Sequence, residues 1–385
     1  MSQANVRERW AMGLEARALI LITAVLVALG LATLFSASAL EALQKGSAPS
    51  TFFVKQLTGA LAGIVLFAAA AKVDAQRLEQ HAPALMWGAI VLMALTLVPG
   101  IGAEHLGSRR YLLGRSVQPA ELMKIAVVIW TAAMVIRKGD QMRRLSKGMP
   151  IFLVMVGIPT LIAFKQPDYS MGLMFVLLML LVLFAAGARI GHFVLLAFLG
   201  APLLWHQVMQ SKYFRDRITA FLGGQGARLE LNEQQAQSLM AVGSGGWTGT
   251  GYGEGMQAYG WIPMGKDDFI AAAIGEEWGF LGLTLVVLAF ATWTWLGFRI
   301  ARKARSRFLQ LVAMGLTATV AITAYVHIGV VINLLPNTGL TLPFFSNGRT
   351  NLVITLLVTG VLVNIGSVRE KVYGELATDP VAAAG

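Results

Sequence analysis

Acidic side chains at the edge of an apolar stretch are the first candidates for chemistry in this sequence. Lys266-Asp267-Asp268-Phe269 precedes a long apolar run, so Asp268 stands where a polar segment enters a predicted helix. A carboxylate in the first turn is favoured by the helix dipole, and either aspartate could simply cap the helix. The other interpretation is a general base that removes a proton from a substrate. The residues alone leave both open.

Further acidic groups begin or enter apolar runs. Glu276 and Glu277 lie deeper in the run that follows the aspartates, where charged groups are costly and are therefore candidates for function. We expect one of them to face the protein interior and to pair with a basic group. Gln166 and Asp168 flank Pro167 at the start of another apolar run. Proline and aspartate are ordinary at helix starts, so a cap competes with a binding role.

Basic side chains form the next group of candidates. Arg110 belongs to a polar stretch. The distribution of basic residues, described below, places this stretch on the outer side of a membrane, where arginine is disfavoured, and this indicates anion binding through charge-assisted hydrogen bonds. Glu121 and Lys124 are spaced to form an i,i+3 pair on one helix. The glycine-rich stretch 243–253 resembles a phosphate loop only weakly, because no strand precedes it.

The elements that position these residues are indicated by composition. The chain has 385 residues, of which 56% are hydrophobic and 13% charged, and its mean hydropathy is +0.65. A soluble domain carries roughly twice this charge. Two runs, Met171–Gly187 and Trp278–Phe298, hold no charged residue. These values exclude a soluble enzyme and a disordered chain, and the absence of cysteine excludes disulfides and zinc–thiolate sites.

The sequence therefore predicts an all-α membrane protein of about ten spanning helices in a single polytopic domain, 1–385. The predicted spans are 18–38, 52–71, 84–102, 119–136, 149–164, 170–187, 190–209, 269–298, 308–335 and 350–367. The first run also resembles a signal peptide, but we interpret it as a span. Basic clusters at 137–147 and 299–307 place both termini in the cytoplasm. The net charge of +11 is then explained by cytoplasmic Lys and Arg residues that contact anionic lipid headgroups, and not by binding of nucleic acid.

Two polar or irregular segments are expected on the outer face. Segment 210–268, between spans seven and eight, is too polar to cross the membrane, and its aromatic residues argue against disorder. It contains Arg215 and Arg217. Segment 336–349 is too apolar for a free loop and too broken for a helix, so we interpret it as re-entrant.

In this order and spacing, the segments resemble the SEDS family of membrane proteins, the RodA/FtsW group, from about residue 15 to 370. The matching motifs are QPAELMK (118–124), QPDYSMG (166–172), YFRDRI (213–218), QSLMAVGSGGWTGTGYGEG (237–255), KDDFIAAAIGEEWGFLG (266–282) and LLPNTGLTLPFFSNG (334–348). The Leu-Thr-Leu-Pro form at 340–343 is more similar to the FtsW branch. Lys266-Asp267 departs from the family's usual His-Thr, and Asn347 from its usual Tyr.

The resemblance implies a peptidoglycan glycosyltransferase that polymerises lipid II at the outer face of the bacterial cytoplasmic membrane, for division or elongation. Inversion at the anomeric carbon needs one base, Asp268, and no covalent intermediate. Arg110 and Lys124 would bind the leaving diphosphate, with Arg215 and Arg217 as weaker candidates; Gln166, Asp168 and Ser346 would contact substrate, and Glu121, Glu276, Glu277 and Pro343 would support the site.

The same resemblance implies a class B penicillin-binding transpeptidase as partner, besides lipid II, the growing glycan strand and membrane lipids. No cofactor is required by the motifs; a divalent cation, Mg²⁺ or Mn²⁺, could neutralise part of the diphosphate charge, although no ligand cluster points to one. Two other classes remain open. A flippase or transporter would also place charges at membrane depth, but it would need a matching set on the inner face. A catalytically silent division scaffold would not need Asp268.

Overall fold

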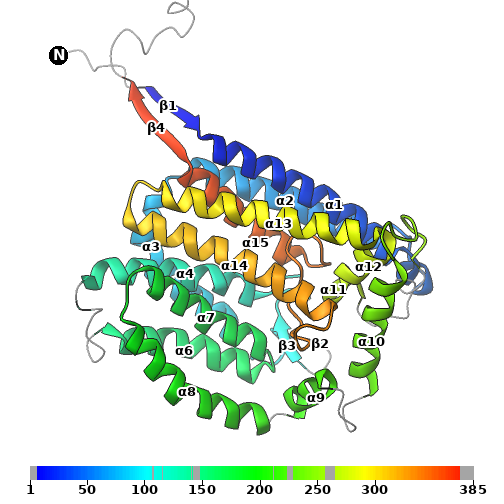
Figure 1. Ribbon diagram of the computed structural model, residues 1–385. Coiled ribbons are helices and arrows are strands. Elements are labelled where there is room, and N and C mark those ends of the chain that lie inside the picture. Colours follow the sequence, from blue (N-terminus) through cyan, green and yellow to red (C-terminus); the bar gives the residue numbers. More distant parts are fainter. Residues whose placement is uncertain are drawn as a thin grey trace, which may run out of the picture.

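The computed structural model describes residues 7–105, 108–114, 116–139, 141, 148–210, 212–222, 229–255 and 265–372. These residues form a bundle of long helices packed side by side (Figure 1). The helices are α1 (Leu14–Gln44), α2 (Thr51–Lys72), the short 3-10 helix η1 (Ala75–Arg77), α3 (Leu78–Leu95), α4 (Pro119–Lys138), α6 (Pro150–Lys165), α7 (Tyr169–Ala185), α8 (Ile190–Gln210), α9 (Lys212–Phe221), α10 (Leu229–Ser244), α11 (Gly265–Asp268), α12 (Ile270–Glu277), α13 (Gly279–Arg302), α14 (Arg307–Val331) and α15 (Arg349–Ile365).

Each predicted span overlaps helix in the structure, which confirms the helical membrane fold, although α3 ends at Leu95 and the predicted span 84–102 continues into turns. Within the described ranges, six helices are long and apolar enough to cross a membrane: α1, α2, the η1–α3 unit, α4, α13 and α14. Helices α6, α7 and α15 are shorter apolar helices. The predicted number of ten spans stays a prediction. The helices α4 and α14 are buried along most of their length, whereas α1, α2 and α13 expose apolar faces that suit contact with lipid.

The predicted span 269–298 is wrong in one respect, because it is divided into α12 and α13. Gly279 has φ +67°, a left-handed conformation that ends one helix before the next begins. The glycine-rich segment packs against this break. The amides of Thr250 and Gly251 donate to the carbonyls of Glu276 and Glu277, at 2.9 and 3.1 Å. The segment expected to be one long outer loop also contains helices α9, α10 and α11.

Short strands mark the two ends of the bundle. Strands β1 (Arg7–Met12) and β4 (Ser367–Val372) pair antiparallel and join the two terminal segments. At the other end, strands β2 (Ala103–His105) and β3 (Ser108–Tyr111) form a second antiparallel pair on the same side of the bundle as α11 and α12 (Figure 1). Asp268 and the described terminal strands therefore lie at opposite ends of the bundle, and the orientation of these ends in a membrane stays a prediction.

The irregular segment between α14 and α15 enters the bundle. Leu342, Phe344 and Phe345 are buried, and the Phe344 ring stacks on Phe290 with 6.3 Å between centroids. Helix α1 approaches this segment closely at Gly30, where an added Cβ would lie 2.3 Å from the carbonyl oxygen of Phe344. A glycine is therefore required for α1 to pack here.

Gly30→Ala is expected to destabilise the fold by about 1–3 kcal/mol, because the new methyl group overlaps a backbone oxygen that cannot rotate away. The loss would be measured as a lower midpoint of thermal unfolding in detergent. Gly157→Ala is the matched control, since a Cβ at that helical glycine meets nothing within 4 Å. Equal midpoints for the two variants would contradict the close packing at Gly30.

Candidate functional site

Asp268 lies at a joint between two short helices at one end of the bundle. Helix α11 ends at Asp268 and α12 begins at Ile270. The N-cap of α12 is Phe269, with no side-chain capping bond, so the cap interpretation of Asp268 does not hold for this helix. The side chain is partly buried. Asp268 is therefore held at a bend of the backbone, with its carboxylate available for other contacts.

The Asp268 carboxylate faces Gly339 and Arg217. A Cβ built on Gly339 would lie 3.7 Å from Oδ2 of Asp268 and 3.7 Å from a guanidinium nitrogen of Arg217. Gly339 has φ +67°, a conformation that glycine adopts readily, and its missing side chain leaves room between the two charged groups. Arg217 is fixed from the other side, because its guanidinium donates to the carbonyl of Asn337 at 2.8 Å.

Burial and neighbouring charge tune this carboxylate. Burial, together with the negative charges of Asp267 and Asp168, raises the pKa of Asp268 to about 6, against the opposing effect of Arg217 and Arg110. A carboxylate with this pKa is ionised at neutral pH but holds a proton far better than an ordinary aspartate does. These are the properties required of a general base. The charged groups from α9, β3 and the start of α7 thus act on one acidic side chain.

Arg217 also lines a cavity of about 440 Å³, whereas Asp268 itself is not among the lining residues. Its polar end is formed by Arg110, Asp168, Arg217 and Asn337. Its walls are mainly apolar side chains of α7 and α14: Leu173, Met174, Val176, Leu177, Leu180, Ile322 and Val326. A cavity with charges at one end and an apolar wall along two membrane helices fits an amphiphile with an anionic headgroup.

Two predicted binding residues, Arg110 and Asp168, meet in this cavity. The Arg110 side chain donates to the carbonyls of Pro167 at 2.9 Å and Gln166 at 3.4 Å, and its Nε lies 3.7 Å from Asp168. Asp168 also caps α7, because its carboxylate accepts from the Met171 amide at 3.4 Å. The same side chain therefore both caps a helix and lines the cavity. Gln166 is buried with its amide directed elsewhere.

The Gln166 amide donates to the Met93 carbonyl at 3.2 Å and to the Thr96 hydroxyl at 2.5 Å. These bonds attach the turn that carries Asp168 to the end of α3. A direct contact of Gln166 with substrate stays a prediction. Ser346 is also buried: its hydroxyl accepts from the Leu342 amide at 2.8 Å. Arg215 is exposed on α9 and does not line the cavity.

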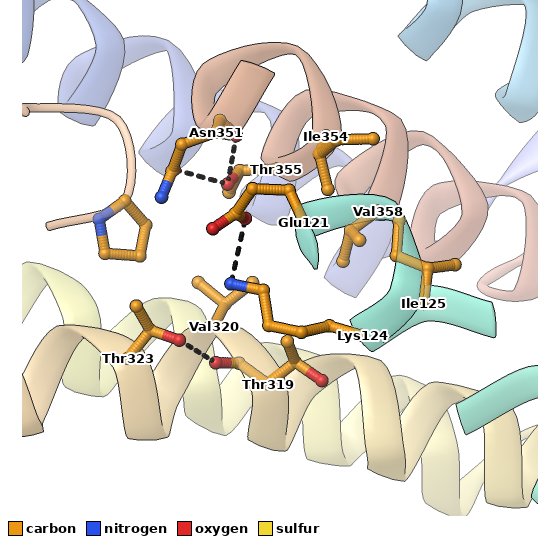
Figure 2. Close-up of a pocket in the computed structure, with 11 residues that line it drawn as sticks. Glu121, Lys124, Ile125, Thr319, Val320, Thr323, Asn351, Ile354, Thr355 and Val358 are labelled. Atoms are coloured by element: carbon orange, nitrogen blue, oxygen red, sulfur yellow. Dashed lines mark hydrogen bonds and ion pairs between the residues drawn. The ribbon is translucent and has the colours of Figure 1, made fainter. Parts of the chain in front are cut away.

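Lys124 lies in a different place from the other predicted anion ligands. Its ammonium pairs with Glu121 at 2.8 Å, and both side chains are at most 3% exposed. They line a separate cavity of about 10 Å³, room for about one water molecule, between α4, α14 and α15 (Figure 2). The predicted i,i+3 pair is thus present. Binding of a diphosphate by Lys124 stays a prediction, and Pro343 lines the same small cavity.

Glu276 and Glu277 are both buried, as expected for at least one of them. Glu277 accepts a hydrogen bond from the Ser36 hydroxyl of α1. Within the described part of the chain, Glu277 has no ion pair with a basic side chain, so the expected pairing is not seen for this residue. Their carbonyls hold the glycine-rich segment described above, which is a supporting role.

Sequence reasoning missed the residues that shape the space around Asp268. Gly339 and Asn337 belong to the LLPNTGLTLPFFSNG motif, but the motif gave no indication that they face Arg217. Over the described ranges, no group of three or more His, Cys, Asp or Glu side chains is arranged to hold a metal ion. We therefore assign no ligand set to the divalent cation considered above.

The bundle and this site define a multi-pass helical membrane protein with a charged cavity at one end of its helices. Residues 16–371 match the FtsW/RodA/SpoVE family of cell cycle proteins. The chain belongs to this family, which confirms the SEDS resemblance.

Relatives and solved structures agree with this assignment. The probable peptidoglycan glycosyltransferase FtsW of Geobacter sulfurreducens is 33% identical over 351 residues, covering 91% of this chain and 94% of the relative. Stage V sporulation protein E of Bacillus subtilis is 36% identical over 349 residues, covering 90% and 95%. A structure described as "Structural coordination of polymerization and crosslinking by a peptidoglycan synthase complex" has a TM-score of 0.75 at 24% identity, covering 91% and 97%. The crystal structure of Thermus thermophilus RodA gives a TM-score of 0.62 at 23% identity, covering 91% and 95%.

Proposed function

We propose that this chain is a peptidoglycan glycosyltransferase that polymerises lipid II into glycan strands, with Asp268 as the general base. The activity class rests on the family and on the relatives named FtsW. The observation that supports the residue assignment is the position of Asp268 opposite Arg217, which lines a cavity with a charged end and an apolar wall.

The reaction joins two lipid-linked sugars. Asp268 accepts the proton of the acceptor hydroxyl as its oxygen attacks the anomeric carbon of the donor. The bond from that carbon to the diphosphate breaks, and the polyprenyl diphosphate leaves with the electron pair. The attack inverts the anomeric centre in one step, so no second carboxylate is needed as a nucleophile.

The basic side chains stabilise the departing group. Arg110 and Arg217 line the charged end of the cavity and are placed to offer charge-assisted hydrogen bonds to the diphosphate as its charge develops. The polyprenyl chain lies along the apolar side chains of α7 and α14. Each side chain thus meets the part of the substrate that matches its chemistry.

The site faces the outer side of the bacterial cytoplasmic membrane in this proposal, and both termini are cytoplasmic. The two dense basic clusters of the sequence support this orientation. A class B penicillin-binding transpeptidase is the proposed partner. The structurally similar synthase complex, which coordinates polymerisation and crosslinking, supports such a pairing.

The function is tested with the purified chain in lipid nanodiscs, together with its transpeptidase and labelled lipid II. We expect a ladder of glycan products on a gel, and no ladder from the transpeptidase alone. Movement of lipid II across the bilayer of a proteoliposome without any polymer would instead indicate a flippase, and would overturn the proposal.

The pH dependence of the rate follows from the environment of Asp268. The raised pKa of about 6 means that the base is protonated and inactive below pH 6 and ionised above it. We therefore expect kcat/KM, which reports ionisations of the free enzyme, to rise with pH along a limb centred at about pH 6. Initial rates between pH 4.5 and 8 at lipid II concentrations well below KM would be measured, and a limb centred near pH 4, typical of an ordinary aspartate, would contradict this environment.

A further inference from the structure

Helix α11, which carries Asp268, cannot hold its own orientation. It spans only Gly265–Asp268, about one turn, and a single turn of helix is not stable without tertiary contacts. The direction of the Asp268 carboxylate therefore depends on what α11 is attached to. The attachments come from the two residues before Asp268 and from the turn at 346–348.

Asn347 binds α11 at two adjacent points. Its backbone amide donates to the carbonyl of Lys266 at 3.0 Å, and its side-chain amide donates to Oδ1 of Asp267 at 2.9 Å. Two bonds from one residue to two consecutive residues fix both the position and the rotation of a short helix. Asp268 is the next residue, so its direction follows.

Asn347 is itself fixed by Gln56 of α2. The Gln56 side-chain amide donates to the Ser346 carbonyl at 3.0 Å, and its oxygen accepts from the Gly348 amide at 3.2 Å. Gln56 is 1% exposed, so these bonds are shielded from water. The Gln56 side chain thus holds the backbone on both sides of Asn347.

We propose that Asn347, held by Gln56, is a positioning residue that fixes α11 and thereby directs the Asp268 carboxylate toward the acceptor hydroxyl. Lys266 supplies an additional anchor, because its ammonium pairs with Glu41 of α1 and lies 4.6 Å from the centre of the Phe52 ring. The inference rests on the proposed role of Asp268 as the base.

Asp267 acts on Asp268 electrostatically, besides helping to position α11 through its bond to Asn347. Among the described residues, the charged and titratable groups that act on Asp268 are Asp267 on its own helix, Arg217 on α9, Arg110 on β3 and Asp168 at the start of α7, with Tyr111 of β3 also near. Burial raises the pKa of Tyr111 to about 12, so it stays neutral through the assay range. Asp267 is thus the neighbour whose charge can be removed while the bond to Asn347 is kept.

The positioning role of Asn347 and Gln56 is tested by kinetics on lipid II with the transpeptidase present. Asn347→Ala and Gln56→Ala should each lower kcat about tenfold with KM within about twofold, because misdirection affects the chemical step more than binding. The double variant should be no worse than the poorer single variant, since both act through the same turn. The control is Thr58→Ala, an exposed residue of α2 whose hydroxyl bonds only within its own helix, and it should match wild type. Wild-type kcat in either single variant, or losses that multiply in the double variant, would overturn the proposal.

The second variant, Asp267→Asn, keeps an oxygen to accept from Asn347 and removes the charge, so it is expected to fold. The acid limb of its pH profile should move down by about 0.5–1 pH unit, because a neighbouring negative charge no longer disfavours ionisation of Asp268. An unmoved limb would overturn the role given to Asp267. If instead wild type makes no polymer, or Asp268→Asn retains wild-type activity, the proposed function itself fails.

Discussion

Replacing Asp268 by asparagine is expected to lower the rate of lipid II polymerisation by about 1,000-fold. The asparagine side chain has the shape of the carboxylate, but at neutral pH it cannot take the proton from the hydroxyl of the acceptor sugar. Because asparagine also relieves the burial of a charge, the variant should be at least as stable as wild type. Product ladders and thermal unfolding midpoints would be measured on the same preparations, with the transpeptidase added.

Asp267→Asn serves as the matched control for this experiment. It makes the same chemical change one residue earlier, and Asp267 contacts Asn347 instead of facing Gly339. It should retain polymerisation at pH 7, where Asp268 remains ionised. Comparable losses in the two variants would show that the aspartate pair acts on the fold, and would remove Asp268 from its assigned role.

The helical class and the position of Asp268 ahead of a long helical stretch were predictable because both depend on local sequence. Long uncharged runs predict spanning helices, and Asp268 is conspicuous because it stands directly before one. The division into α12 and α13 was not predictable. Gly279 stands in an apolar run where any helical glycine would be compatible with the pattern, and its left-handed backbone follows from the packing of the segment at 243–255.

The partners of the candidate residues depend on tertiary structure, which the sequence did not supply. The Lys124–Glu121 pair could be predicted from the i,i+3 spacing, but the separate small cavity that the two residues line could not. The Ser346 hydroxyl accepts from the Leu342 amide, and its predicted contact with substrate stays a prediction. Motif membership indicated that these residues matter without indicating which atoms they contact.

The same limit explains why the sequence could not distinguish Arg215 from Arg217 as a ligand of the diphosphate. The segment around them was predicted as a loop, in which two nearby arginines are equivalent. The structure places both on helix α9, where residues two apart point about 200° from each other around the axis. Arg217 consequently lines the cavity, and Arg215 is exposed.

This difference leads to the second prediction with a large effect, which concerns the leaving diphosphate. Arg217→Ala should lower kcat/KM for lipid II about 100-fold, equivalent to about 2.7 kcal/mol, as expected for lost hydrogen bonds to a charged group. Arg215→Ala should have a smaller effect, since that side chain lies outside the cavity. Initial rates over a range of lipid II concentrations would measure both.

Arg217 should also leave a signature in the pH profile, and this separates its charge from its shape. Its positive charge lowers the pKa of Asp268, so Arg217→Ala should move the acid limb to higher pH, opposite to the shift expected for Asp267→Asn. Arg217→Lys keeps the charge but loses the planar fork, so the limb should stay near its wild-type position while kcat/KM recovers only in part. If Arg217→Ala and Arg215→Ala had equal effects and neither moved the limb, the diphosphate could not be bound where Arg217 faces Asp268.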